Sequence, residues 1–279
     1  MADVTAERPR TLGELGHKLV GRVVVYALFP VLLSQAFALR RHALTLVPAA
    51  GRPDGKIGRG EPLRFLAIGD SIIAGVGARR IERSTVVHVA RFMSGRLSRE
   101  INWHACGTIG AGARRVRREV VPQLPAQPFD VILVSVGVND VLKLERSGRF
   151  RRQLLKLIRD LRRHSPHAVI GYLGLMPLDE FPKLRRPLRW IVGYRVRRFD
   201  AVAREALARV PNAMHIPVHF SPRPDMFSDD GLHPSETSQR RLAKIIAGAL
   251  TPHLAARSQD GSMSASSNHS HSLDYGHPT

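Results

Sequence analysis

The chain has 279 residues, of which 43% are hydrophobic and 24% charged, an ordinary globular composition that excludes disorder of the whole chain. Lysine and arginine outnumber aspartate and glutamate by 43 to 23, a formal charge of +20 that raises the question of an anionic partner. The single cysteine, Cys106, excludes an intrachain disulfide scaffold. No Cys/His spacing of a structural zinc site accompanies it.

The first 61 residues are expected to form an N-terminal extension. Its apolar stretch, residues 23–39, carries no charge and lies between Arg22 on one side and Arg40 and Arg41 on the other. A helix of this length reaches about 26 Å, against a hydrocarbon core of roughly 30 Å. We expect a helix that lies on or in a membrane, with an export signal and a helix packed on the main domain as the alternatives.

The rest of the chain divides by composition. The arginines after the apolar stretch would keep the following domain in the cytoplasm if the helix spanned a membrane, so the predicted location is cytoplasmic, with membrane association through residues 23–39. Residues 48–61, rich in glycine and proline, are typical of a linker. Residues 62–257 are predicted to form the main domain, and residues 258–279, rich in serine and histidine, a disordered tail.

Strand and helix patterns alternate through the main domain. Strands are predicted at residues 63–68, 101–105, 131–136, 168–173 and 214–218, and helices at residues 85–97, 113–124, 150–163, 184–209 and 236–254. The helix at residues 113–124 is expected to be interrupted near Pro122. The run at 131–136 (VILVSV) is apolar on both faces, as expected of a central strand covered by helices. The alternation predicts one doubly wound α/β domain with a five-stranded parallel sheet.

Four short motifs follow predicted strands. They are GDSI at residues 69–72, GTIGAG at 107–112, GVND at 137–140 and, in the loop before the last helix, DGLHP at 230–234. In open parallel sheets the ligand binds outside the carboxyl ends of the strands. The sequence therefore predicts a site built from these four loops.

The motifs contain the groups that acyl transfer needs. Ser71 supplies a hydroxyl nucleophile and His233 the imidazole that takes its proton, while Asp230, three residues before His233, can orient the ring. The negative charge that develops on the substrate oxygen needs preorganised donors, and the backbone amides of Ser71 and Gly110 and the side-chain amide of Asn139 can supply them.

These four segments resemble the sequence blocks of the SGNH hydrolase superfamily, also called GDSL esterases and lipases, and the resemblance spans residues 65–234 in the family's order. It implies Ser71 as nucleophile, Gly110 and Asn139 as the other oxyanion-hole residues, and Asp230 and His233 as the Asp-x-x-His pair. It further implies a three-layer, flavodoxin-like α/β/α fold, no metal or organic cofactor, and hydrolysis of carboxylic esters, thioesters or lysophospholipids, with acyl transfer in some branches.

The chain departs from the family pattern at two positions. Ile72 stands where the name-giving motif has leucine, a change that conserves volume. Ala105 stands where the second block often carries an asparagine five residues before its glycine, which leaves Gly107 as a rival to Gly110 for the amide donor.

Three further residues near the motifs are assigned to structure. Asp70 and Asp140 are expected to fix their loops through hydrogen bonds to nearby amides. Cys106, at a strand end, is expected to be a small buried hydrophobic residue.

The substrate and partners are less directly encoded. Residues 183–198 contain seven basic and no acidic residues, interleaved with apolar ones. They read either as a basic amphipathic helix that contacts anionic lipid near the cleft or as a surface helix whose apolar stripe packs on the sheet. With the stretch at 23–39, they favour a small-molecule acyl-ester or lipid substrate, lysophospholipids included, and an anionic membrane surface as partner. No motif encodes the oligomeric state.

Two other functions remain as alternatives to a serine esterase. An acyltransferase of the same superfamily differs only in the group that accepts the acyl chain. A basic membrane- or nucleic-acid-binding protein without catalysis would explain the charge, but no nucleic-acid-binding module accompanies it, so no specific nucleic acid is expected.

Overall fold

A computed structural model describes residues 46–181, 185–218, 223–229 and 231–267. The predicted apolar helix at residues 23–39 and the end of the tail, residues 268–279, lie outside the described residues. Among the described helices, none has the length and apolar character needed to cross a membrane.

The described residues form a six-stranded sheet in the order β1-β3-β2-β4-β5-β6. The five predicted strands are confirmed as β2 (Pro62–Gly69), β3 (Glu100–Gly107), β4 (Val131–Ser135), β5 (Val169–Leu173) and β6 (Ala213–Ile216), and neighbours among them run parallel. Counted in chain order, these five lie in the order 2-1-3-4-5, that of flavodoxin-like folds.

The sheet has one more strand than predicted. β1 (Asp54–Ile57) pairs antiparallel with β3 at the edge, inside the segment predicted as a linker. It fits there because Gly55 lies opposite Trp103, and a Cβ at Gly55 would lie only 2.9 Å from the indole ring. The sheet therefore begins before residue 62, where the sequence predicts the domain to start.

Helices fill the connections between the parallel strands, and one more helix follows the last strand. The connecting helices are α2 (Thr85–Leu97), α3 (Ala113–Arg115), α4 (Val138–Leu142), α5 (Ser147–His164) and α6 (Leu188–Leu207), with short 3-10 turns at Ile81–Arg83, Val121–Gln123 and Leu178–Glu180. After β6 come a 3-10 turn at Pro224–Met226 and α7 (Glu236–Ser267). The helix predicted at residues 113–124, with an interruption near Pro122, is split into α3, a π-helix at Val116–Val120 and a 3-10 turn, so that its regular α-helical part ends earlier than predicted. Pro122 lies in that last turn and cannot donate the hydrogen bond that a continuing α-helix needs.

The tail predicted to be disordered from residue 258 is helical as far as Ser267. Leu254 is the last described position of α7 that is buried. Beyond it the helix continues because each added residue gains a hydrogen bond without a new nucleation cost.

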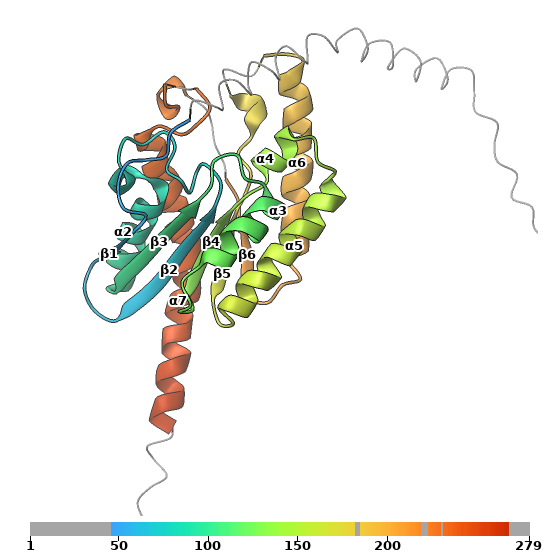
Figure 1. The fold of residues 1–279 in the computed structure, drawn as a ribbon. Helices are drawn as coiled ribbons and strands as arrows, with labels where there is room; N and C mark the ends of the chain where they lie inside the picture. The colour runs from blue at the N-terminus through green and yellow to red at the C-terminus, as the bar shows by residue number, and fades with distance from the viewer. Residues whose placement is uncertain (1–45, 182–184, 219–222, 230, 268–279) are drawn as a thin grey trace, which may run out of the picture.

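The domain has three layers, as predicted. α2 and α7 pack together on one face of the sheet, and α3, α5 and α6 cover the other (Figure 1). Every residue of β4 is buried, which confirms it as a central strand. Because β2 to β6 are parallel, their carboxyl ends lie along one edge, and the loops that follow them meet there.

Candidate active site

Ser71 lies in the turn that follows β2. The strand ends at Gly69, which has φ +157° and whose position leaves no room for a Cβ against the Ser135 carbonyl of β4. One residue later, the Asp70 carboxylate accepts a hydrogen bond from the Ile72 amide at 3.1 Å and one from the Ser135 hydroxyl at 3.0 Å. The turn that carries Ser71 is thus held against two strands, and Asp70 has the structural role predicted for it.

His233 lies beside Ser71, although 162 residues separate them in the chain. The Nε2 atom of His233 is 2.8 Å from the Ser71 Oγ, which is hydrogen-bond distance for a general base and its nucleophile. Both residues are half-buried. Asp230, the expected third member of the group, lies outside the described residues.

The loop that carries His233 is folded back on itself. The Ser228 amide donates to the His233 carbonyl at 2.9 Å, and Phe227 and Pro234 form an antiparallel bridge. On the side of the nucleophile, Gly77 has φ +94°, and a Cβ there would collide with the Pro234 carbonyl. The His233 loop therefore packs directly on the segment that follows Ser71.

The first turn of α7 fastens this contact through Gln239, which is only 1% exposed. Its Oε1 accepts a hydrogen bond from the Thr85 amide at 2.9 Å. Its Nε2 donates to the carbonyls of Val76, at 3.2 Å, and Pro234, at 3.3 Å. One side chain thus ties together the nucleophile segment, the His233 loop and the start of α2.

Glu236, the first residue of α7, makes a second connection. Its Oε1 accepts from the Arg79 amide at 3.1 Å, and its Oε2 accepts from the Arg83 guanidinium at 2.7 Å. The Arg83 contact lowers the pKa of the Glu236 carboxyl and raises that of Arg83. We call Gln239 and Glu236 the α7 latch.

Gly110 and Asn139 lie on the loops after β3 and β4. Gly110 has φ +73° and open space where a Cβ would be. The Asn139 Nδ2 donates to the Ala111 carbonyl at 3.1 Å, which orients the side-chain amide. Within the described residues, the backbone amides of Ser71 and Gly110 donate to no protein group. These two amides are therefore available to an incoming oxygen atom.

Gly107, the rival to Gly110, has a different environment. A Cβ at Gly107 would collide with the backbone of Ala74, in the turn after Ser71. Only glycine permits this close approach between β3 and that turn. The packing explains Gly107 as a residue that sets the spacing between β3 and the turn.

Side chains after β4 connect the two donor loops. The Lys143 ammonium donates to the Gly110 carbonyl at 2.7 Å, and the Asp140 carboxylate accepts from the Ala113 amide at 3.1 Å. Together with the bond from Asn139, these contacts hold the loop after β3 against α4. The predicted structural role of Asp140 is confirmed.

Burial shifts the pKa of three groups around these loops. Desolvation raises the pKa of Asp70 to about 6, against the opposing effects of the Ile72 and Ser135 hydrogen bonds and the charge of His233. Desolvation also raises the pKa of Asp140 to about 6, although the Ala113 amide opposes it. Cys106 is half-buried in β3 and packs against the core, where desolvation raises the pKa of its thiol. This agrees with the prediction of an apolar role for Cys106.

Sequence reasoning missed four residues that shape the site. Each makes a hydrogen bond to a segment of the site: Ser135 to Asp70, Lys143 to Gly110, Glu236 to the Arg79–Arg83 segment, and Gln239 to the His233 loop. None belongs to a motif that carries reacting groups, and their partners are distant in the chain except for Pro234. No sequence signal identifies such contacts.

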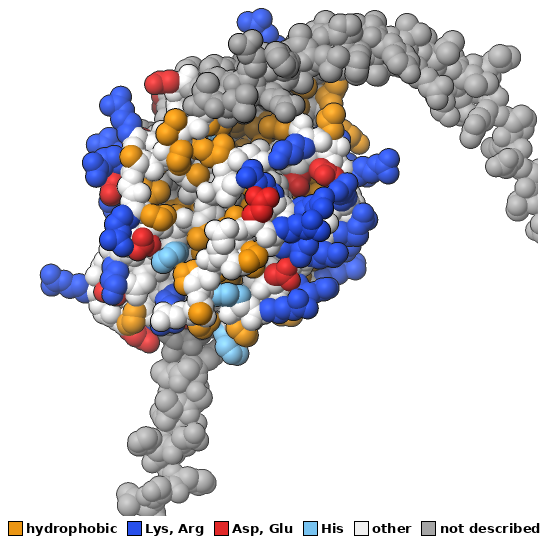
Figure 2. Space-filling model, in the orientation of Figure 1, with side chains coloured by type: hydrophobic (Ala, Val, Ile, Leu, Met, Phe, Trp, Pro, Cys, Tyr) orange, Lys and Arg blue, Asp and Glu red, His pale blue; other side chains and the backbone are white. Residues whose placement is uncertain are grey.

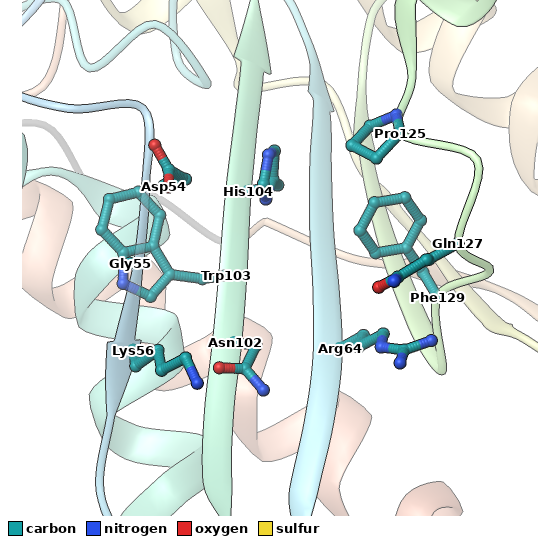
Figure 3. Close-up of a pocket in the computed structure, with 10 residues that line it drawn as sticks. All are labelled: Asp54, Gly55, Lys56, Arg64, Asn102, Trp103, His104, Pro125, Gln127 and Phe129. Carbon is teal, nitrogen blue, oxygen red and sulfur yellow. The ribbon is translucent and has the colours of Figure 1, made fainter.

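Other features of the described residues do not add to this site. A hollow of about 370 Å³ lies on the face of β1, β3 and β2, away from the motif loops, and its lining includes Lys56, Arg64, Asn102 and His104 (Figure 3). No group of His, Cys, Asp and Glu side chains in the described part of the chain is arranged to hold a metal ion.

Comparison with known proteins yields consistent matches. The model of the GDSL-like Lipase/Acylhydrolase family matches residues 67–241. The GDSL-like esterase Rv1075c of Mycobacterium tuberculosis (strain ATCC 25618 / H37Rv) is 26% identical over 230 residues, which cover 75% of this chain and 73% of that protein.

Solved structures show the same fold. The lipase Lip_vut3 from a goat rumen metagenome has a TM-score of 0.58 and 20% identity, and the match covers 68% of this chain and 98% of that one. The psychrotrophic esterase EstA from Pseudoalteromonas sp. has a TM-score of 0.54 and 15% identity, with the same coverage of 68% and 98%.

Proposed function

The chain belongs to the GDSL-like lipase/acylhydrolase family and is a hydrolase that acts on ester bonds, and from this premise we propose that Ser71 is its nucleophile and His233 its general base. The observation that carries the proposal is the 2.8 Å contact between the Ser71 Oγ and the His233 Nε2. A serine hydroxyl is a weak nucleophile until an imidazole takes its proton, and this contact supplies the imidazole.

The reaction proceeds in two steps through an acyl-enzyme. As the Ser71 Oγ bonds to the ester carbonyl carbon, its proton moves to the His233 Nε2, and the carbonyl oxygen becomes an oxyanion. When the bond to the alcohol breaks, His233 gives that proton to the departing oxygen. Water then attacks the acyl-enzyme in the same way, its proton passing through His233 back to Ser71, which releases the carboxylic acid.

The oxyanion is stabilised by the amides of Ser71 and Gly110 and by the Asn139 side chain. Two observations support this assignment. The two backbone amides donate to no other group among the described residues, and the hydrogen bond to the Ala111 carbonyl orients the Asn139 side chain. Removing one such donor typically costs about 10²–10³-fold in rate. In this proposal Asp230 holds the second ring nitrogen of His233, as its place three residues earlier suggests.

The proposed substrates are carboxylic acyl esters, lysophospholipids among them. The basic, apolar character of residues 183–198 and the apolar stretch at 23–39 support a lipid-like ester and an association with membranes through the latter. An acyltransferase would use the same residues and differ only in replacing water by another hydroxyl, and no contact among the described residues of the site favours that variant.

The test is the loss of the nucleophile. Ser71→Ala should lower kcat for a soluble p-nitrophenyl ester at least about 10³-fold, because no hydroxyl remains to form the acyl-enzyme. The measurement is initial-rate hydrolysis, with circular dichroism as the check that the variant is folded.

A second readout locates the reacting atom. A fluorophosphonate, which forms a covalent bond with activated serines, should label Ser71 in the wild type, as identified by peptide mass spectrometry. It should label neither Ser71→Ala nor His233→Ala. Undiminished hydrolysis by Ser71→Ala, or label on another serine, would refute the assignment.

A further inference from the structure

The exposed large hydrophobic residues of the described chain are unevenly placed. Of the seven in this class, five lie on α4, the turn after it and the first two turns of α6. We call these five the α4–α6 surface: Leu142, Leu144, Trp190, Ile191 and Tyr194. Leu144, Trp190 and Tyr194 are 72%, 58% and 61% exposed. A cluster of large apolar side chains exposed to solvent typically marks an interaction site.

α6 has two apolar faces, and folding accounts for only one. Val192, Val196 and Phe199 are buried against the domain, as one of the two predictions for this segment requires. Trp190 and Tyr194, one helical turn apart, are turned to solvent instead. The internal packing of the domain gives no reason for these outward side chains.

Basic residues surround the α4–α6 surface. Arg185, Arg186, Arg146 and Lys143 are exposed, and residues 185–199 contain no acidic residue. The Arg186 guanidinium lies 4.9 Å from the centre of the Trp190 ring, a cation–π arrangement. Figure 2 shows hydrophobic side chains over the upper end of α6 with Lys and Arg side chains beside them. Aromatic and arginine side chains together are typical of protein surfaces at the headgroup level of a bilayer.

The surface adjoins the proposed active site. Leu142 and Leu144 flank Lys143, whose ammonium binds the Gly110 carbonyl at 2.7 Å. The turn after α4 is also fastened to α6, because the Arg195 guanidinium donates to the Glu145 carbonyl at 2.6 Å. A partner that covers the α4–α6 surface would therefore lie next to the loop that holds Gly110.

We propose that the α4–α6 surface docks on an anionic lipid bilayer, with Trp190, Tyr194 and Leu144 entering the headgroup region and Arg185 and Arg186 contacting lipid phosphates. Charge complementarity selects this occupant. Residues 185–199 are rich in arginine and contain no acidic residue, and anionic lipid complements this positive charge, whereas the apolar stretch at residues 23–39 is uncharged and does not. The binding itself does not depend on the proposed function, but docking in this orientation would bring the active site to ester substrates in the membrane.

The direct test follows the fluorescence of Trp190 in the full chain. The protein carries Ser71→Ala, so that it does not hydrolyse the lipid during the measurement. The chain has two tryptophans, and Trp103 is buried, so the difference between this protein and a Trp190→Phe variant reports on Trp190. With phosphatidylglycerol vesicles containing brominated lipid, the Trp190 signal should shift to the blue and be quenched. Vesicles of phosphatidylcholine with the same bromine content should produce much less change.

Charge reversals test the role of the arginine rim. Arg185→Glu with Arg186→Glu should weaken vesicle partitioning about 30-fold or more, since each basic residue near an anionic surface contributes about a factor of five. Arg240→Glu with Arg241→Glu makes the same charge change at exposed positions of α7 and should weaken it much less.

Three results would overturn the proposal. They are the absence of binding, equal loss in the two double variants, and sedimentation with vesicles while the Trp190 signal stays unchanged, which would assign binding to another part of the chain. Because Ser71→Ala is used throughout, failure here is separate from failure of the esterase assignment.

Discussion

At the scale of single residues, the proposed reacting groups are held in place by neighbours to which we assign no part in the reaction. Ser71 is held in place because Gly69 and Gly107 let strand ends and turns approach more closely than any side chain would permit, and because Asp70 binds the Ile72 amide. The ionised form of Asp70 is unfavourable in this environment. Its carboxylate is buried, and its pKa is raised to about 6.

This pKa predicts a dependence of stability on pH. The folded-state pKa of Asp70, about 6, exceeds the ordinary value of 3.8, so the folded protein binds this proton more tightly than the unfolded chain does. The free energy by which this tighter proton binding stabilises the folded protein is fully present below about pH 4, and it is lost as the pH rises through 6. Asp70→Asn removes the buried charge and keeps an acceptor for Ile72 and Ser135.

The expected outcome is that Asp70→Asn is more stable than the wild type by about 2–3 kcal/mol at pH 8, with near parity at pH 4. Urea unfolding at both pH values measures the difference. Asp225→Asn, at an exposed position, controls for the loss of one negative charge. If Asp70→Asn were less stable than the wild type at pH 8, the ionised carboxylate would be a stabilising group instead.

At the scale of elements, the site consists of loops that are held in place by hydrogen bonds from two helices, α4 and α7. α4 brings Asn139, Asp140 and Lys143 to the loop after β3. The start of α7 brings Gln239 and Glu236 to the segment after Ser71. We therefore expect the contact between Ser71 and His233 to depend on the α7 latch, although the latch touches neither the Ser71 Oγ nor the His233 Nε2.

Gln239→Ala should lower kcat about 10-fold, an order of magnitude that corresponds to about 1.4 kcal/mol in the barrier, while the KM for a soluble ester stays nearly unchanged. It also leaves the buried Thr85 amide without its acceptor, which costs about 1–3 kcal/mol of stability. Steady-state kinetics and thermal unfolding measure the two effects.

Lys244→Ala, exposed on the same helix, is the matched control and should change neither quantity. A structural role alone would lower the unfolding temperature of Gln239→Ala and leave kcat intact at temperatures where the variant is folded. That result would remove Gln239 from the residues that position His233.

At the scale of the whole molecule, the charge of +20 has consequences beyond the reaction. It attracts polyanions without specificity, and that attraction weakens steeply as counterions compete. The proposed reaction instead depends on contacts within the molecule, such as that of Ser71 with His233, which salt screens much less.

Raising the salt from 50 mM to 500 mM should therefore abolish binding of a labelled duplex DNA and leave hydrolysis of an uncharged p-nitrophenyl ester within about two-fold. Fluorescence anisotropy measures the DNA binding and initial rates measure the hydrolysis, both in identical buffers. DNA binding that persists at high salt, with a loss of hydrolysis, would favour the alternative of a nucleic-acid-binding protein.

Much of the fold was predictable because its signals are local. The five parallel strands follow from apolar runs such as residues 131–136, and their connections from helical periodicity. The exceptions have different causes. β1 lies among glycines that are typical of a linker, and its pairing depends on Trp103, far along the chain, so no local signal reveals it. The interruption predicted near Pro122 is present, but the α-helix already ends at Arg115 and continues as a π-helix and a 3-10 turn.

The sequence by itself determined the fold class and the family and predicted which loops carry the proposed reacting groups, because strand periodicity and the motifs after strands are written within a few residues. Only the tertiary structure decided that Gly107 spaces a turn while Gly110 has open space beside it, that Gln239 joins three distant segments, and that Trp190 and Tyr194 of α6 face solvent. These facts depend on which backbone atoms approach across the folded chain, and no residue pattern along one segment encodes that distance.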